Sequence, residues 1–300
     1  MSGEASRCGF VALLGAPNSG KSTLLNALIG SKISIVTPKV QTTRTRVLGV
    51  MNLGNAQVVF IDTPGIFQPK KRLDRAMVAA AWDSALNADL VLMLIDAKSG
   101  IDRNARRIID GLKRSEGQTI CILNKIDTVE RQRLLSLTEE LARERIFMEF
   151  FMISALKGDG VDDVKSGMFD YIAEGPWHFP EDQLSDMSDR LFAAEITREK
   201  LYMNLHQELP YALTVETETW QSFENGAVRI DQTIFVERSS QKGIVLGRGG
   251  QRIKHIRTLA QEELKEIFER EVHLFLFVKV RENWGDDPER YQDLGLDFGV

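Results

Sequence analysis

The stretch Gly15-Ala16-Pro17-Asn18-Ser19-Gly20-Lys21-Ser22 decides the fold, because it matches the phosphate-binding pattern G-x-x-x-x-G-K-[ST]. An apolar run at residues 10–14 precedes it, and leucines at helical spacing follow Thr23. In such a loop, backbone N–H groups surround phosphates at a helix N-terminus, Lys21 reaches the β- and γ-phosphates, and the Ser22 hydroxyl binds Mg²⁺. The flanking strand and helix make a plain glycine turn the weaker interpretation. We expect Gly15, Asn18, Ser19, Gly20, Lys21, Ser22 and Thr23 to bind nucleotide.

Strands and helices alternate outward from this loop. Apolar runs at residues 58–61, 90–95, 119–123 and 150–153 are separated by segments with helical spacing at residues 73–86, 103–112, 131–145 and 161–172. Strands that are apolar throughout and alternate with helices are typical of a mainly parallel sheet covered on both faces. Ligands of such sheets bind at the carboxyl ends of the strands. The sequence therefore predicts an α/β domain with its chemical motifs at that edge.

A second motif, Asp62-Thr63-Pro64-Gly65, ends the apolar run at residues 58–61. A carboxylate at this place can hold Mg²⁺ through water, and the Gly65 N–H can meet the γ-phosphate. Residues 37–46 between the two motifs are polar without helical spacing, as in a mobile switch loop. A threonine hydroxyl of this loop would complete the Mg²⁺ shell. We favour Thr43 and keep Thr42 as the alternative, while a plain basic loop also remains open.

The base is selected by Asn124-Lys125-Ile126-Asp127, which follows the run at residues 119–123. The Asp127 carboxylate can accept hydrogen bonds from guanine N1–H and from its exocyclic amine, a pair of contacts that adenine lacks. The Lys125 stem would lie along the ring, and Asn124 would tie the loops together. Ser154-Ala155-Leu156 follows the next apolar run and would supply a backbone N–H for guanine O6. GTP is therefore favoured over ATP.

The second half of the chain has a different pattern. Residues 174–189 carry two prolines and several acids and are typical of a linker. Beyond them come a helical segment (190–207), two alternating segments (212–220 and 228–237), a glycine-rich turn, a helix to residue 270 and a strand at 272–280. This order predicts a small α+β domain. We expect a first domain at 1–176, a linker at 177–189 and a second domain at 190–300.

A basic island at residues 241–257 contains no acidic residue, although the chain has a net charge of −5. Within it, Gly247-Arg248-Gly249-Gly250 forms a G-x-x-G turn, in which backbone N–H groups approach a nucleic-acid backbone closely. Ile244, Leu246, Ile253 and Ile256 would form an apolar floor for bases. On charge alone a solvated helix face is an equal alternative. The residues expected to bind RNA are Lys242, Ile244, Gly247, Arg248, Gly249, Gly250, Arg252, Ile253 and Lys254.

With these motifs in place, the chain resembles the Era family of ribosome-assembly GTPases. The resemblance rests on GAPNSGKSTLLNALIG (15–30), QTTRTR (41–46), DTPGI (62–66), NKID (124–127), SAL (154–156) and IVLGRGGQRIKHI (244–256), the last similar to a KH signature. It implies a Ras-like P-loop GTPase domain and a KH domain of the bacterial type. It also implies small-subunit ribosomal RNA near its 3′ end and the small ribosomal subunit as partners, with weak peripheral membrane contact in some members. Arg257 departs from the family pattern, which has a small residue after Ile256.

The composition is that of an ordinary globular chain, with 43% hydrophobic and 27% charged residues. Its apolar runs are too short to cross a bilayer, and residues 1–8 lack the apolar core of a signal peptide. Two cysteines, Cys8 and Cys121, make no disulfide framework. We expect a monomer in the cytoplasm.

One piece of the hydrolytic apparatus is missing from the sequence. In Ras-type enzymes a glutamine directly after D-x-x-G orients the attacking water, and here that position is Ile66. Slow intrinsic hydrolysis is expected, with Asn18, Lys21, Thr43, Asp62 and Gly65 as catalytic candidates. In related GTPases an asparagine at the position of Asn18 holds K⁺, so K⁺ joins GTP, GDP and Mg²⁺ as a predicted ligand; a purely loop-shaping Asn18 is the alternative.

Two functions remain open at this point. One is a switch whose nucleotide state sets its RNA affinity during small-subunit assembly. The other is an RNA chaperone in which nucleotide is structural and does not change RNA affinity.

Overall fold

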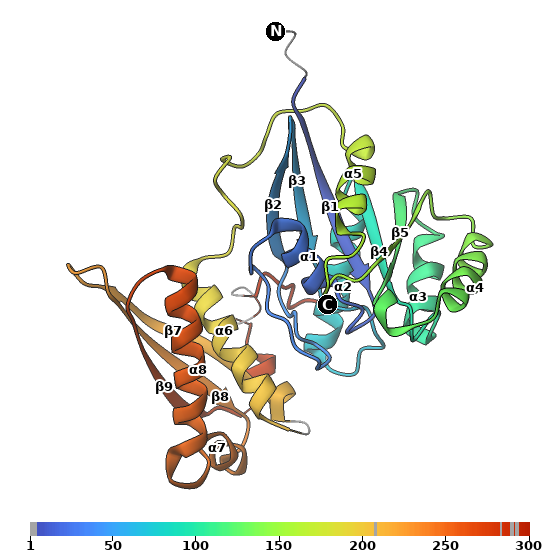
Figure 1. Ribbon diagram of the computed structural model, residues 1–300. Coiled ribbons are helices and arrows are strands. Elements are labelled where there is room, and N and C mark those ends of the chain that lie inside the picture. Colours follow the sequence, from blue (N-terminus) through green and yellow to red (C-terminus); the bar gives the residue numbers. More distant parts are fainter. Residues whose placement is uncertain (1–4, 207–208, 283, 289–290, 292–293) are drawn as a thin grey trace. The chain divides into compact units, whose positions relative to one another are not determined.

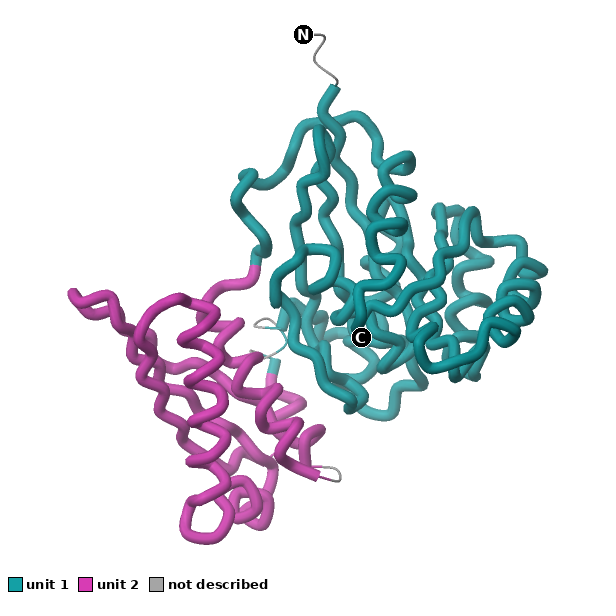
Figure 2. The backbone as a smooth tube through the Cα atoms, in the orientation of Figure 1, with its two compact units in different colours: residues 1–186, 288–300 teal, residues 187–287 magenta. Residues whose placement is uncertain are grey.

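A computed structural model describes residues 5–206, 209–282, 284–288, 291 and 294–300. The chain forms two compact units, one of residues 1–186 with 288–300 and one of residues 187–287 (Figure 2). This division differs in two places from the boundaries expected from the sequence. Residues 177–186, expected as linker, and residues 288–300, expected in the second domain, both belong to the first unit.

The first unit is built on a six-stranded sheet with the order β2-β3-β1-β4-β5-β6 (Figure 1). Adjacent strands are parallel except β2, which is antiparallel to β3. The β1 strand lies centrally, and five of its nine residues are a continuous buried stretch. The predicted α/β fold is confirmed. The strands are β1 (Arg7–Gly15), β2 (Val47–Leu53), β3 (Ala56–Asp62), β4 (Leu90–Asp96), β5 (Gln118–Asn124) and β6 (Phe150–Ile153).

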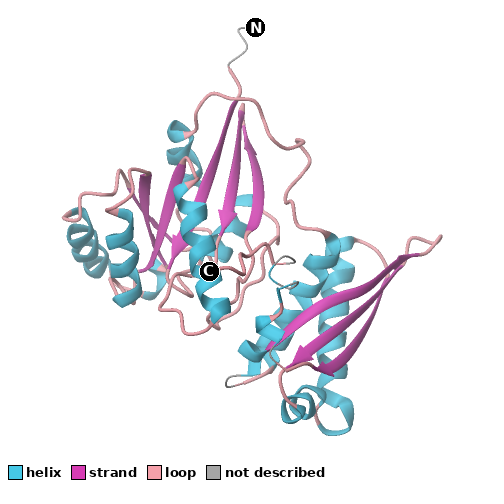
Figure 3. Cartoon of the chain, turned by 180° about the vertical axis from the view of Figure 1, so that it is seen from behind, coloured by secondary structure: helices cyan, strands magenta, loops and turns pink. Residues whose placement is uncertain are grey.

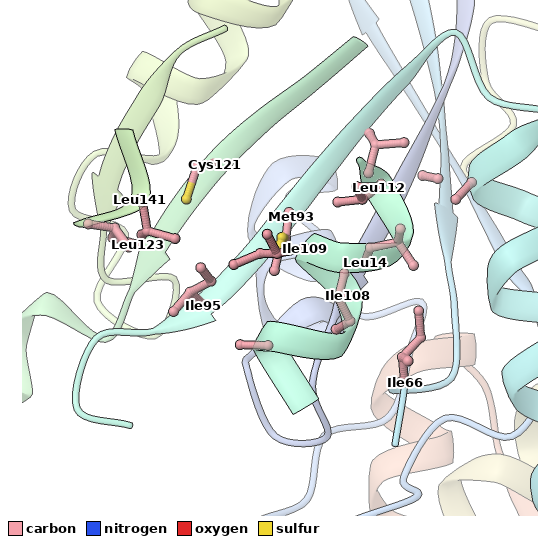
Figure 4. Packing of buried hydrophobic residues seen from close by; sticks show 14 of the residues in the cluster. Leu14, Ile66, Met93, Ile95, Ile108, Ile109, Leu112, Cys121, Leu123 and Leu141 are labelled. Atoms are coloured by element: carbon pink, nitrogen blue, oxygen red, sulfur yellow. The ribbon is translucent and has the colours of Figure 1, made fainter. Parts of the chain in front are cut away.

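Helices connect the parallel strands and cover the sheet. Side chains of α2, α3 and α4 pack with alternate residues of β1, β4 and β5 into one apolar core, part of which is seen in Figure 4. Cys121 lies in this core, where burial raises the pKa of its thiol and keeps it neutral. The helices of the first unit are α1 (Lys21–Ile29), α2 (Arg72–Leu86), α3 (Arg103–Leu112), α4 (Arg131–Ala142) and α5 (Val161–Met168).

The β2 strand was not anticipated from the sequence. Its residues include Gly49 and Asn52. Both residue types are uncommon in strands, and they interrupt the apolar run that would indicate a strand. The strand forms because Gly54, at φ +60°, turns the chain tightly back into β3. Each residue of β2 then has an antiparallel partner in β3, from Val47 with Asp62 to Leu53 with Ala56.

Residues 178–185 run along β2 and β3 in place of the expected linker. The buried Gln57 side chain accepts hydrogen bonds from the N–H groups of His178 and Phe179, each at 2.9 Å. The Val50 N–H donates to Leu184 O at 2.8 Å. Polar backbone groups of this segment are therefore paired with the sheet, which explains why the segment belongs to the first unit.

The second unit is a three-stranded sheet with helices packed against it (Figure 3). In the order β7-β8-β9, β8 is antiparallel to β7 and parallel to β9. Leu201, Tyr202, Ile234 and Ile256 belong to its core. The expected α+β domain is confirmed. Its elements are α6 (Asp189–Asn204), β7 (Leu213–Ser222), β8 (Val228–Val236), α7 (Ser239–Leu246), α8 (Gln251–Phe268) and β9 (Val272–Val280).

Candidate functional site

The phosphate loop spans the gap between the end of β1 and the start of α1. Gly20 has φ +101°, and a Cβ there would lie 2.1 Å from Asn124 Nδ2, so only glycine fits. Lys21 is buried, and its Nζ donates to Gly15 O and Ala16 O, each at 3.3 Å. Burial lowers the pKa of Lys21 to about 8, while the nearby Asp62 acts in the opposite direction. An anionic ligand bound beside Lys21 would therefore stabilise the charged form of its ammonium group.

Three oxygen-bearing side chains meet beside this lysine. Ser22 Oγ donates to Asp62 Oδ2 at 2.7 Å and lies 2.9 Å from Thr43 Oγ1. Asp62 is fully buried, and its Oδ1 has no hydrogen-bond partner among the described residues. Burial raises the pKa of Asp62, and Lys21 opposes the shift. Hydroxyl and carboxylate oxygens, one of them without a partner, are the donor set that fits Mg²⁺.

The loop of residues 37–46 distinguishes its two candidate threonines. Thr42 Oγ1 donates to Lys39 O at 2.7 Å and lies 2.7 Å from Thr37 Oγ1, within the loop itself. Thr43 Oγ1 is directed at Asp62 Oδ2, 3.4 Å away. The geometry therefore favours Thr43. Ser34, which no sequence motif marks, also donates to Asp62 Oδ2 at 2.9 Å.

The loops that would hold the base are fastened to the phosphate loop by Asn124. Its Nδ2 donates to Ser19 O at 2.9 Å, and its Oδ1 accepts from Ala155 N at 3.0 Å. Lys125 Nζ donates to Asn18 O at 2.6 Å and to Asp96 Oδ2 at 2.7 Å. Sequence reasoning missed Asp96, although its place at the carboxyl end of β4 is a signal that could have found it.

Asp127 lies at the rim with its carboxylate ready to accept hydrogen bonds. A hydrogen bond from the buried Ser154 lowers the pKa of Asp127 below its ordinary value, and Lys157 Nζ stands 3.5 Å away. Leu156 is exposed beside it. An ionised acceptor at this point suits a base that presents two neighbouring N–H donors.

The nucleotide motifs line one cavity of about 330 Å³. This size is within the range of small-molecule sites. Ser19, Ala155 and Asp62 are buried and are not among the residues that line the cavity. Its lining includes Asn18, Gly20, Lys21, Ser22, Thr23, Thr43, Gly65, Asn124, Lys125, Asp127 and Leu156.

The residue after D-x-x-G faces away from this cavity. Ile66 is fully buried and packs in the apolar core with Leu14, Ile108 and Ile109 (Figure 4). Its side chain has no polar atom and is not exposed to solvent. The chain accordingly lacks a side-chain base at the position where Ras-type enzymes have glutamine.

In the second unit, the turn between α7 and α8 presents backbone and positive charge. Gly247, Gly249 and Gly250 all have positive φ, and a Cβ on Gly249 would meet nothing within 4 Å. Arg248, Arg252 and Lys254 are exposed around the turn, and Lys242 is partly exposed on α7. Arg252 Nη1 also donates to Ile244 O at 2.6 Å, which braces the end of α7.

The apolar floor expected beside the turn is smaller than the sequence suggested. Ile244 is 48% exposed, whereas Leu246 and Ile253 are partly buried against the core. Ile256 is fully buried within that core. Ile256 is therefore a core residue, and among the residues predicted to form the floor Ile244 is the most exposed.

Comparison with known proteins gives the same two-part organisation. A family model described as a 50S ribosome-binding GTPase matches residues 10–125, and a KH-domain model matches residues 208–285. GTPase Era of Afipia carboxidovorans is 59% identical over 293 residues, which is 97% of this chain and 95% of the relative. The chain belongs to the Era family of GTPases. GTPase Era of Rhizobium meliloti is 56% identical, covering 97% of this chain and 93% of the relative.

Two solved Era structures match nearly the whole chain. Era in complex with MgGDPNP and nucleotides 1506–1542 of 16S ribosomal RNA has a TM-score of 0.92 at 40% identity, covering 97% of this chain and 99% of that one. A variant of Aquifex aeolicus Era bound to GDP and AlF₄⁻ also has a TM-score of 0.92 at 40% identity, covering 96% and 99%. The Ras-like and KH folds expected from the Era resemblance are thereby confirmed.

Proposed function

We propose that this Era-family GTPase is a switch that binds small-subunit ribosomal RNA near its 3′ end and assists assembly of the small subunit. The observation that carries the proposal is the solved Era complex, in which a chain of the same fold holds MgGDPNP and a segment of 16S RNA together. The complex with GDP and AlF₄⁻ adds that a related chain forms a hydrolysis-like state. An RNA chaperone with structural nucleotide is the competing function.

The nucleotide site consists of the motif residues gathered at the edge of the first sheet. Lys21 holds the β- and γ-phosphates, and the Gly65 N–H meets the γ-phosphate. The Ser22 and Thr43 hydroxyls, with Asp62 through water, would hold Mg²⁺, which when bound would supply positive charge to those phosphates. The residues assigned to nucleotide are Gly15, Asn18, Ser19, Gly20, Lys21, Ser22, Thr23, Asn124, Lys125, Asp127, Ser154, Ala155 and Leu156.

Potassium would supply positive charge beside the phosphates in a site where Ile66 stands in place of the Ras-type glutamine. The Asn18 side chain lies against the loop of residues 37–46, where its Nδ2 donates to Pro38 O at 3.0 Å. Asn18 also lines the nucleotide cavity, and the Oδ1 atom of its amide is an oxygen ligand of the kind that K⁺ takes. We propose Asn18 as a K⁺ ligand on this basis.

Hydrolysis should depend on the monovalent cation. Replacing K⁺ by Na⁺ is expected to slow GTP hydrolysis by the intact protein on the order of tenfold, because the smaller Na⁺ would not fill a site of K⁺ size and the positive charge beside the phosphates would then be missing. Asn18→Ala should hydrolyse slowly in both salts. Phosphate release measured for both proteins in matched KCl and NaCl checks this. Equal rates for the unaltered protein in the two salts would leave Asn18 with a loop-shaping role only.

RNA binding is assigned to the G-x-x-G turn and its basic flanks. The turn offers backbone N–H groups without obstructing side chains, which is how KH domains hold single-stranded nucleotides. Its cations attract the phosphates. The residues assigned to RNA are Lys242, Ile244, Gly247, Arg248, Gly249, Gly250, Arg252, Ile253 and Lys254.

Gly249→Asp tests this surface. The new carboxylate would repel the RNA backbone, and RNA affinity is expected to fall about tenfold or more while basal GTP hydrolysis is unchanged. Gly226→Asp is a matched control, because Gly226 also has positive φ and open space but lies in the turn between β7 and β8. Titration of a labelled 16S 3′-end RNA measures both. Normal RNA binding by Gly249→Asp would remove the turn from the site.

The oligomeric state, the cell compartment and membrane contact are also part of the proposal. We propose a monomer that works in the cytoplasm, in keeping with the two free cysteines. None of the helices in the described part of the chain is both long and apolar enough to cross a membrane. The expectation of weak peripheral membrane contact rests only on the family resemblance.

A further inference from the structure

Residues 288–300 follow the second unit in the chain, but Tyr291, Leu294, Leu296 and Phe298 of this segment pack on a helix of the first unit. Tyr291 and Leu296 are buried in one apolar cluster with Ala76 and Met77 of α2. Leu73, Ala80, Leu294 and Phe298 lie at its margin. Figure 2 shows the described residues of this segment (288, 291 and 294–300) in the colour of residues 1–186. The second unit is thus joined to the first at both of its ends, after Asp186 and before Pro288.

The cluster has specific side-chain geometry as well as burial. The Tyr291 and Phe298 rings meet edge to face with centroids 5.0 Å apart. The Arg72 guanidinium lies 4.4 Å from the centroid of the Phe298 ring, a cation–π contact at the first residue of α2. Tyr291, Leu296 and Phe298 are therefore held to α2 from its first turn onward, and a shift of α2 would move them.

The start of α2 is also bonded to the loop that closes the nucleotide cavity. Asp74 is buried, and its Oδ1 accepts a hydrogen bond from Gln41 Nε2 at 3.1 Å. Its Oδ2 accepts from the N–H groups of Lys70 and Lys71, each at 3.0 Å, and so fixes the first turn of the helix. Gln41 lines the nucleotide cavity two residues before Thr43. One helix therefore contacts the nucleotide loop at its start and residues 288–300 along its side.

We propose that residues 288–300 are a strap through which α2 transmits the nucleotide state to the RNA-binding unit. A change in the loop of residues 37–46 moves α2 through Gln41 and Asp74, and α2 carries the strap that continues directly from residue 287. This proposal rests on the proposed function, because it needs RNA affinity to depend on nucleotide. Such coupling is reciprocal, so RNA should change nucleotide affinity by the same factor.

The strap can be released without touching either binding site. In the double variant Tyr291→Ala/Leu296→Ala, the apolar cluster loses the two buried side chains that residues 288–300 contribute to it. Val300→Ala is the control, since Val300 is an exposed residue of the same segment. For each protein, the affinity for 16S 3′-end RNA is measured with a non-hydrolysable GTP analogue and with GDP. GTP affinity without RNA and thermal unfolding are recorded alongside.

The unaltered protein and Val300→Ala are expected to bind RNA about 5- to 150-fold more tightly with the GTP analogue, the usual range of coupling between sites. In the double variant this ratio should fall to about one, with GTP affinity unchanged. A ratio that persists in the double variant would overturn the strap while leaving the switch intact. A ratio of one in the unaltered protein would overturn the switch and with it the coupling.

Hydrogen exchange gives a test that needs no substitution. If the strap transmits, exchange protection of α2 and of residues 294–300 should change together when GDP is replaced by the GTP analogue. A change in residues 37–46 with no change in residues 294–300 would overturn the strap, even if the double variant failed to fold.

Discussion

Lys21→Ala is expected to lose GTP binding. Lys21 is the buried cation of the phosphate loop, and in the substitution the β- and γ-phosphates lose a charge-assisted contact worth about 3 kcal/mol or more, at least two orders of magnitude in affinity. Backbone N–H groups alone would have to hold the phosphates. Titration with a fluorescent GTP analogue in the presence of Mg²⁺ measures the loss.

The matched control for this substitution is Lys98→Ala. Lys98 is an exposed lysine that follows β4 at the same edge of the sheet, so its removal changes the net charge equally without touching the loop. Both variants should keep the unfolding temperature of the unaltered protein without nucleotide. Near-normal GTP affinity of Lys21→Ala would mean that the phosphates bind elsewhere.

Asp127→Asn should change which base the protein prefers. Guanine would lose two hydrogen bonds to an ionised acceptor, whereas xanthine presents a C2 carbonyl that accepts a hydrogen bond from the new amide. Sites that read a base through paired polar groups discriminate strongly, so the preference for GTP over xanthosine triphosphate should fall on the order of a thousandfold. Competition of the two nucleotides against a labelled GTP analogue measures the ratio.

Asp159→Asn provides the comparison for the base experiment. Asp159 is an exposed carboxylate in the neighbouring loop, and the same chemical change there should leave the preference untouched. An unaltered preference in Asp127→Asn as well would show that another group reads the base.

The nucleotide motifs could be located from sequence because each is short and local. A phosphate loop needs glycines and a lysine within eight residues, and the parallel arrangement then places Asp62, Asn124 and Ser154 at one edge of the sheet. The cavity brings these segments together. The glycine turn of the second unit was recognisable for the same reason.

Contacts between distant segments left no comparable signal. Ser34 donates to Asp62 and Asp74 accepts from Gln41, and neither pairing belongs to a spaced motif. The β2 strand escaped notice because its formation depends on pairing with β3 and not on its own residues. The packing of Tyr291 on α2 joins residues that are far apart in the sequence, and local apolar spacing does not encode such a contact.

The segment at residues 178–185 has a consequence for solubility. β2 is the outer strand of the first sheet, and an outer strand with unpaired N–H and C=O groups is a template for aggregation. Here Ser185 pairs with Gly49, and the Val50 N–H is taken by Leu184 O. The chain thus shields its own sheet edge from other copies. A fragment of residues 1–176 would expose that edge, whereas a fragment ending at Asp186 would keep residues 178–185 paired with it.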